Sequence, residues 1–293
     1  MKRHCVRDLH GPVDEAALTA LPYDACLQWR RPLPAGDLAR VVRWLSVRPN
    51  AALRLYGAAC EQIETLAAGV FLPARLTLEA ARLSASVPAL PGVRDLALEG
   101  TPADPAAVLA AAPALETLQV DCCGGAFDLA VLANVPNLQR LSLAAARVGG
   151  VVPWPAAASL RAVELRNCNA ASVAGVLALP GLRALRLSAI GRLRSIEALA
   201  GHASLRALCL ESLVHLDSLQ ALATLPALES LDIAGLWQFS VAEAGFMTSM
   251  SGLRRLAVDI GGRRKNVEIY KKLQLPKPPP FDIRDDSYDL TMV

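Results

Sequence analysis

The sequence contains few aromatic residues, and this scarcity limits both its core and its surface. Phe, Trp and Tyr make up 4% of the 293 residues, whereas hydrophobic residues make up 53%. Leucine, alanine and valine must therefore build the interior, for which there is ample material. An excess of one charge is also missing, because 30 Lys and Arg oppose 27 Asp and Glu. A balanced charge does not indicate a nucleic-acid-binding surface. A repeat in the sequence also places one arginine per unit in a column with no interleaved aromatic residue, which favours a solvated rim: Arg94, Arg161, Arg183, Arg206 and Arg254.

Long apolar runs and paired cysteine motifs are absent too. No stretch reaches about 18 uncharged apolar residues, so we expect no membrane-spanning segment. The chain starts with MKRHCVRDLHGPVDE, which has no apolar run, so no secretory signal is expected. The seven cysteines are odd in number and include no Cys-x-x-Cys pair. We therefore predict a cytoplasmic protein with reduced thiols and no bound metal.

Motifs of the common catalytic chemistries are missing from the sequence. It contains no GxGxxG, no Walker loop, no HExxH and no GxSxG. We therefore predict a protein that is not an enzyme and needs no cofactor. One alternative is an enzyme with a non-standard site near Cys209, where Arg186 would stabilise a thiolate and Glu164 would lie close by.

The main positive feature is a repeat of 22 or 23 residues, with a last step of 25. The unit Leu-x-x-Leu-x-Leu has apolar residues at its first, fourth and sixth positions. Its clear copies begin at Val93, Leu115, Leu138, Leu160, Leu182, Leu205, Leu228 and Leu253. Alternation at the fourth and sixth positions predicts a strand in each copy, and a fixed period of this length predicts a solenoid. The ninth position, which includes Cys123, is expected to turn into the core.

A second pattern precedes several strands and predicts how the chain returns. Apolar residues spaced by three end in a proline, as in Val173, Val176, Leu179 and Pro180. This spacing suits a 3-10 helix or a single helical turn with one buried stripe. Proline then ends the turn because it has no N–H to continue it. One strand and one short return therefore fill one repeat.

These residues together resemble the leucine-rich-repeat superfamily, in its short-repeat class. The resemblance covers residues 93–258 and continues toward the N-terminus, where Leu18, Leu21, Pro22, Leu27 and Trp29 follow the same order. It implies an α/β leucine-rich-repeat solenoid, with a curved parallel sheet on the concave face and short helical or 3-10 returns on the convex face. It also implies binding of another protein on the concave face. The ninth position departs from the family, which usually has asparagine there.

The ends of the chain differ from the repeat. Residues 1–49 are predicted to form an N-terminal cap and an irregular first repeat, 50–258 the solenoid, 259–275 a C-terminal cap and 276–293 a proline-rich, acidic tail. Within the caps, residues 36–48 are predicted as an amphipathic helix and residues 267–270 as an edge strand. The cluster of Trp237, Phe239, Phe246, Met247 and Met250 forms either the core of the C-terminal cap or a hydrophobic contact patch. Trp154 is expected to pack against the convex side, the alternative being that it is presented to a partner.

The repeat also sorts side chains into columns on the predicted concave face, at its third, fifth and seventh positions. Glu79, Glu99 and Asp121 share the seventh position of three consecutive strands. Like charges that face each other in a sheet are unfavourable, and a basic partner would relieve them. The alternative is a solvated row of carboxylates with no binding role. The residues predicted to contact a partner are Tyr56, Glu79, Glu99, Asp121, Gln119, Glu164, Arg166, Arg186, Glu211 and Asp232.

The function that these observations favour is binding of another protein that carries a basic patch. We expect neither a nucleic-acid partner nor a membrane partner. The many Ala and Arg and few Lys residues are typical of a GC-rich bacterial genome. We predict an inhibitor, such as an immunity protein against a toxin, or an adaptor. The alternative is an accessory subunit or scaffold of a biosynthetic enzyme system.

Overall fold

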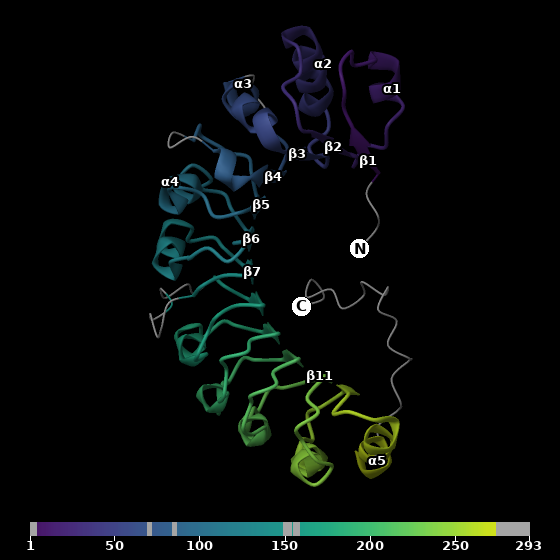
Figure 1. The fold of residues 1–293 in the computed structure, drawn as a ribbon, viewed down its shortest axis with the longest axis vertical. Helices are drawn as coiled ribbons and strands as arrows, with labels where there is room; N and C mark the ends of the chain where they lie inside the picture. The colour runs from purple at the N-terminus through teal and green to yellow at the C-terminus, as the bar shows by residue number, and fades with distance from the viewer. Residues whose placement is uncertain (1–4, 69–71, 84–86, 149–153, 155–158, 274–293) are drawn as a thin grey trace. The chain divides into compact units, whose positions relative to one another are not determined.

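The computed structural model describes residues 5–68, 72–83, 87–148, 154 and 159–273 (Figure 1). The chain forms two compact units. The N-terminal unit contains the described residues between 5 and 125 and between 131 and 138. The C-terminal unit contains residues 126–130 and the described residues from 139 to 273. The predicted tail, residues 276–293, lies outside the described residues.

The N-terminal unit consists of parallel strands joined by short helices, and each strand pairs with the next one in the sequence. Its strands are β1 (Val6–Asp8), β2 (Cys26–Trp29), β3 (Ala52–Leu55), β4 (Arg75–Glu79), β5 (Asp95–Glu99) and β6 (Thr117–Asp121). Its helices are α1 (Glu15–Thr19), α2 (Ala35–Ser46), α3 (Ile63–Ala68) and α4 (Pro105–Ala110), with 3-10 helices η1 (Gly57–Gln62) and η2 (Ala80–Arg82). In Figure 1 the helices of this unit stand on one side of its strands.

The C-terminal unit repeats this plan with 3-10 helices as returns. Its strands are β7 (Arg140–Ala144), β8 (Ala162–Arg166), β9 (Ala184–Ser188), β10 (Ala207–Glu211), β11 (Ser230–Ala234) and β12 (Arg255–Val258). They pair in parallel and in sequence order. The returns are η4 (Ala174–Ala178), η5 (Glu197–Leu199), η6 (Gln220–Thr224) and η7 (Glu243–Ser249), and helix α5 (Arg263–Leu273) follows β12. A further 3-10 helix, η3 (Leu129–Asn134), has residues in both units.

The core consists of leucine side chains stacked at equal register. Leu185 of β9 lies opposite Leu208 of β10, which lies opposite Leu231 of β11. All three side chains are buried. Because side chains alternate across a strand, the fourth and sixth positions of each repeat face this core and the third, fifth and seventh face away. The predicted α/β leucine-rich-repeat solenoid with 3-10 returns is therefore confirmed.

The residue after a strand often has a left-handed backbone conformation, which the sequence analysis did not foresee. The non-glycine examples at the eighth position are Ala145, Asn167, Ala189 and Ser212, with φ between 49° and 53°. The N–H of each donates to the carbonyl of the seventh residue in the next repeat; Ala189 N donates to Glu211 O over 2.9 Å. The turn thus extends the backbone ladder by one residue and directs the ninth side chain inward. These bonds need no asparagine at the ninth position.

One repeat places this turn differently. In the repeat that begins at Leu115, the left-handed residue is Cys123, with φ of 47°, and its side chain is exposed. Cys122 is buried instead, at 2% exposure. The prediction that Cys123 faces the core was wrong. Gly124, with φ of 83°, supplies a second left-handed residue and lets the turn begin one position later.

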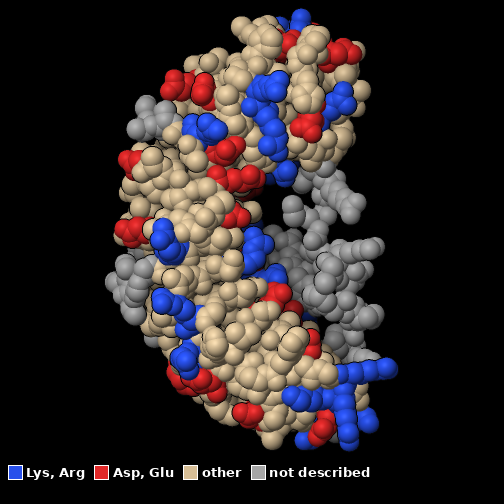
Figure 2. Space-filling view, in the orientation of Figure 1, with Lys and Arg blue, Asp and Glu red and all other residues tan. Residues whose placement is uncertain are grey.

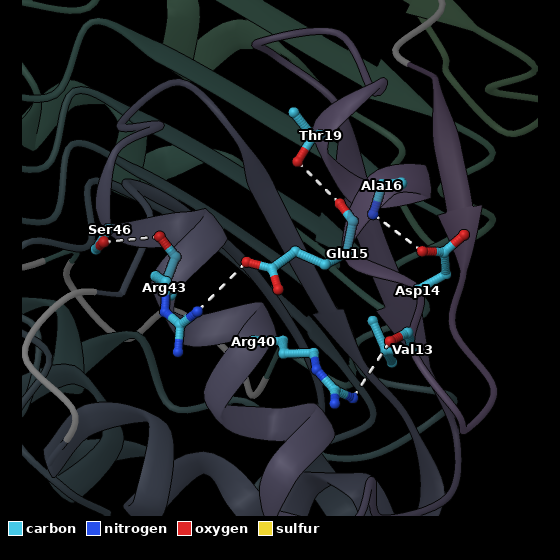
Figure 3. A network of polar contacts seen from close by, with 8 residues as sticks. All are labelled: Val13, Asp14, Glu15, Ala16, Thr19, Arg40, Arg43 and Ser46. Carbon is cyan, nitrogen blue, oxygen red and sulfur yellow. Dashed lines mark hydrogen bonds and ion pairs between the residues drawn. The ribbon is translucent and has the colours of Figure 1, made fainter.

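A helix pair near the start of the N-terminal unit is held by polar contacts. Helix α2 confirms the amphipathic helix predicted over residues 36–48. Its Arg43 pairs with Glu15 of α1 over 3.3 Å (Figure 3). The indole N–H of Trp44 donates to the carbonyl of Leu18 over 2.6 Å. These contacts join α1 to α2, and β1 comes before them as a strand that the sequence analysis missed.

The segment after β12 is a helix, so the predicted edge strand at residues 267–270 was wrong. Helix α5 buries Ile269 at 2% exposure. The hydroxyl of Tyr270 accepts a hydrogen bond from Val258 N over 2.8 Å, and Asn266 Oδ1 accepts from Ile260 N over 3.1 Å. These contacts with the last residue of β12 and with the segment that follows it stabilise a helix at this place. The alternation of apolar and polar residues over 267–270 could not reveal them.

The aromatic residues of the C-terminal unit divide between core and surface. Phe239 is buried at 3% exposure, as predicted for a cap core, and Trp154 is buried at 7%. Trp154 packs so closely against Gly175 that a methyl group there would overlap its indole. Trp237 is 70% exposed. The cap-core alternative is therefore confirmed for Phe239, and the exposure of Trp237 leaves the contact-patch alternative a prediction.

Candidate functional site

The predicted alignment of three carboxylates in the N-terminal unit is confirmed. We call the side of the strands that bears the third, fifth and seventh positions the strand face, and Glu79, Glu99 and Asp121 the acidic row. Glu79 of β4 lies opposite Glu99 of β5, and Glu99 lies opposite Asp121 of β6. Neighbouring strands are about 4.8 Å apart, so the backbones of these three acidic residues follow one another at that spacing.

Each carboxylate of the acidic row is anchored by the chain itself. Glu79 Oε2 accepts from Gly57 N over 2.7 Å, and Glu79 Oε1 lies 3.7 Å from Arg82 Nε. Asp121 Oδ1 accepts from Cys123 N over 3.1 Å. Both backbone donors belong to turns that follow a strand. The carboxylates are therefore held in position, and Arg82 partly compensates the charge of Glu79.

Tyr56 links the acidic row to a basic neighbour. Its hydroxyl donates to Glu99 Oε1 over 3.1 Å. Partial burial and the negative charge of Glu99 raise the pKa of Tyr56, so the phenol stays protonated and able to donate. The guanidinium of Arg30 lies 5.0 Å from the centre of the Tyr56 ring. Arg30 was not among the predicted contact residues. Its position could have been found from the repeat, because Arg30 follows the core residue Trp29 just as Tyr56 follows the core residue Leu55.

The strand face of the C-terminal unit carries a network centred on Arg186 of β9. Arg186 Nη2 lies 2.9 Å from Glu211 Oε2, and Arg186 Nε lies 3.7 Å from Glu164 Oε1. Ser142 Oγ donates to Glu164 over 2.7 Å, and Ser188 Oγ donates to Glu211 over 3.1 Å. Glu164 lies directly opposite Arg186 on the neighbouring strand, which brings the two charges together. The network leaves one guanidinium between two carboxylates.

Cys209 and Asp232 continue this face but lack the features of a reactive pair. Cys209 of β10 lies between Arg186 and Asp232 in register. Burial, helped by the charge of Asp232, raises the pKa of Cys209 to about 12 although Arg186 opposes the shift. Burial also raises the pKa of Asp232. The Cys209 thiol is therefore protonated near neutral pH, whereas a nucleophilic cysteine needs a lowered pKa.

The remaining predicted contact residues are exposed on their strands. Gln119 of β6 lies opposite Ala97, and Arg166 of β8 lies opposite Ser188. Neither has a side-chain hydrogen bond to another described residue. The structure thus places all ten predicted residues on strand faces. Four of them form one group in the N-terminal unit: Tyr56, Glu79, Glu99 and Asp121. Four others form a group in the C-terminal unit: Glu164, Arg186, Glu211 and Asp232.

The other features of the described residues lie away from these groups. A groove of about 720 Å³ in the C-terminal unit is lined by loop residues that include Phe127, Arg147, Asn169 and Arg192. Within the described ranges, no three His, Cys, Asp or Glu side chains are placed to hold a metal ion. No helix among the described residues has both the length and the apolar character needed to cross a membrane.

Comparisons with known proteins yield structural neighbours only. No family model and no curated protein matches the chain. An internalin (InlF) from Listeria monocytogenes has a TM-score of 0.49 at 14% identity, covering 84% of this chain and 76% of its own. Internalin C2 from the same species has a TM-score of 0.42 at 17% identity, covering 68% and 84%. A chain of the Toll–Spätzle complex of Drosophila has a TM-score of 0.48 at 14% identity, covering 87% and 43%.

The fold assignment therefore rests on the chain's own repeats. Each repeat contributes one parallel strand, leucines at the same inward positions and a short helical return. The protein is a leucine-rich-repeat solenoid.

Proposed function

We propose that this protein binds another protein through the strand face of its N-terminal unit and catalyses no reaction on it. The partner brings basic side chains to the acidic row. The observation that supports this most is the anchoring of three like charges at one register, on a face where solvent or a partner must compensate them. The strand face of the C-terminal unit, with Glu164, Arg166, Arg186, Glu211 and Asp232, is proposed as a further contact surface.

The like charges of the acidic row repel one another at the register that the strands impose. Two unit charges about 5 Å apart repel each other by about 1 kcal/mol in water and about 3 kcal/mol at an effective dielectric constant of 20. Lys or Arg side chains of a partner would replace this repulsion by attraction. Because Glu79 and Asp121 are already held by backbone N–H groups, little side-chain freedom is lost when the partner binds.

The finer role that we propose is that of a cytoplasmic bacterial inhibitor, such as an immunity protein, or of an adaptor. A scaffold or accessory subunit of a biosynthetic enzyme system is the second candidate. The cysteines support an intracellular setting, since they are odd in number and include no Cys-x-x-Cys pair. An enzyme centred on Cys209 is disfavoured by the raised pKa of that thiol.

The test removes the charges of the acidic row and keeps its geometry. The triple variant Glu79→Gln, Glu99→Gln, Asp121→Asn retains oxygens that accept from Gly57 N, Tyr56 Oη and Cys123 N. A partner is captured from lysate with the unchanged protein, purified, and titrated against both forms by calorimetry. We expect the Kd to rise at least about tenfold, because each lost pair contributes about 1 kcal/mol. The effect should shrink as salt is added.

The matched control removes three charges from the helical side of the same unit. Glu15, Glu61 and Glu64 are exposed, and changing all three to Gln alters the net charge by the same amount. This variant should bind like the unchanged protein. An equal Kd for the acidic-row variant and the unchanged protein would remove the acidic row from the interface. Equal losses in both variants would show a general charge effect and would also reject the proposal.

A further inference from the structure

A second surface, at the end of the C-terminal unit, combines exposed apolar side chains with a basic helix. Trp237 is 70% exposed, and Val214 is 58% exposed. Trp237 is the second residue after Gly235, and Val214 is the second residue after Ser212; Gly235 and Ser212 both have a left-handed backbone conformation. The strands of these two neighbouring repeats, β10 and β11, are paired. Large exposed apolar side chains of this kind mark contact sites, and Trp is over-represented among the residues that dominate binding.

The indole of Trp237 is held against the backbone. A methyl group on Gly261 would lie 2.9 Å from Cδ1 and 3.0 Å from Cγ of Trp237, so the ring occupies the space beside this glycine. Gly261 also has a φ of 88°, which other residues rarely adopt. An anchor that is already fixed loses little conformational entropy on binding.

Helix α5 begins two residues after Gly261 and is strongly basic. It contains five Lys or Arg residues and one Glu, which gives 5 − 1 = +4. A groove of about 500 Å³ on this helix is lined by Arg263, Arg264, Val267, Glu268 and Lys271. Within α5, Lys272 pairs with Glu268 over 3.3 Å. Figure 2 shows a concentration of Lys and Arg where α5 lies in Figure 1.

The burial of α5 decides between two kinds of anionic partner. A helix that lies on a membrane needs a free apolar face. In α5, Ile269 is buried and Tyr270 contacts Val258, so the most apolar side of the helix already packs on the sheet. The exposed side offers positive charge, the small apolar floor at Val267 and the neighbouring Trp237. This combination fits a protein segment better than a bilayer.

We propose that the Trp237 surface, formed by Trp237, Val214 and the exposed side of α5, binds an acidic peptide segment of a partner protein. An apolar side chain of the segment packs on Trp237 and Val214, and its carboxylates pair with Arg263, Arg264 and Lys271. This surface belongs to the C-terminal unit and does not depend on the acidic row, so its test and that of the proposed function can fail separately.

The experiment uses Trp237 as its own reporter. The other three tryptophans, Trp29, Trp44 and Trp154, are 1%, 5% and 7% exposed. Acrylamide therefore quenches mainly Trp237 in the full chain. The probe is a synthetic glutamate-rich peptide with two central leucines, added at low salt. We expect the peptide to protect the tryptophan fluorescence from quenching and to bind with an affinity that falls as salt rises.

Variants identify the groups that hold the peptide. Trp237→Ala should weaken binding, measured by anisotropy of a labelled peptide, by about tenfold. The reversal Arg263→Glu, Arg264→Glu, Lys271→Glu should weaken it by more than that. The matched control reverses Arg161, Arg183 and Arg206, which are exposed in the same unit, and should change the affinity far less. Far-ultraviolet circular dichroism confirms that each variant is folded.

Three results would overturn the proposal. The first is unchanged quenching of Trp237 at saturating peptide. The second is equal protection of Trp237 by vesicles of phosphatidylcholine and phosphatidylserine, which would assign the surface to a membrane. The third is a Trp237 that is shielded without peptide and becomes quenchable when Asp282, Asp285, Asp286 and Asp289 are changed to Asn. In that case the chain's own acidic segment would be the occupant.

Discussion

Replacing Ala189 by glycine is expected to stabilise the protein, although glycine usually weakens a folded chain. Ala189 has a φ of 53°, and its side chain is exposed. A left-handed conformation costs a non-glycine residue about 1–2 kcal/mol. The greater freedom of glycine in the unfolded chain costs about 0.5–1 kcal/mol. The free energy of unfolding should therefore rise by about 0.5–1 kcal/mol, because the bond from residue 189 N to Glu211 O is kept.

The control for this prediction is Ala184→Gly in the same repeat. Ala184 lies in β9, where the backbone is extended, and is 1% exposed. Glycine there should lower the free energy of unfolding by about 1.5 kcal/mol, from the same entropy and about 0.8 kcal/mol of lost methyl burial. Urea unfolding followed by circular dichroism gives the midpoints and slopes of both variants. Comparable slopes are required, since repeat proteins can unfold in more than one step.

The outcome that refutes the reasoning is a loss of stability in Ala189→Gly as large as that in Ala184→Gly. It would mean that the turn after β9 stores no strain. A gain in Ala189→Gly with a loss in Ala184→Gly would show that backbone conformation, and not glycine content, decides the sign.

Three further predictions concern half-buried groups of the C-terminal unit. Gly175→Ala should lower stability by about 1–3 kcal/mol, because the added methyl overlaps Trp154, whereas Gly191→Ala, which has open space, should melt like the unchanged protein. Asp232→Asn should raise the urea midpoint of unfolding at pH 7. Burial raises the pKa of Asp232 in the folded state, so ionisation of this carboxyl above its unfolded pKa lowers the free energy of unfolding. Below about pH 4 the carboxyl is protonated in both states, and the gain from Asn should vanish. Cys209, with a pKa of about 12, should react with iodoacetamide at pH 8 far more slowly than exposed Cys5 when labelling is measured by mass spectrometry.

The strands and their register could be predicted because the repeat carries that information locally. Counting from Leu182 or Leu205 gives the inward and outward positions of each strand, since side chains alternate and the first leucine fixes the phase. The same count aligned Glu79 with Glu99 and Asp121. Strands β3 and β4 continue the same register before the first clear copy of the repeat at Val93.

What the sequence could not provide depends on contacts between distant residues. The choice of helix for residues 263–273 depends on the contact of Tyr270 with Val258. Glu79 is anchored by the backbone N–H of Gly57. Every residue except proline has such an N–H, so no sequence motif could have indicated this contact. Trp237 and Phe239 are both aromatic and two residues apart. The path of the turn alone exposes the first and buries the second.

The contact between Tyr270 and Val258 has a consequence for assembly. In a stack of parallel strands, the last strand presents the same unpaired backbone groups that bound each strand before it. The Tyr270 hydroxyl and Asn266 occupy the N–H groups of Val258 and Ile260. Without them, these donors would be available to the first strand of another copy, and head-to-tail addition of this kind yields open filaments. Helix α5 thus covers the outer edge of the last described strand and keeps these two donors from pairing with a strand of another copy.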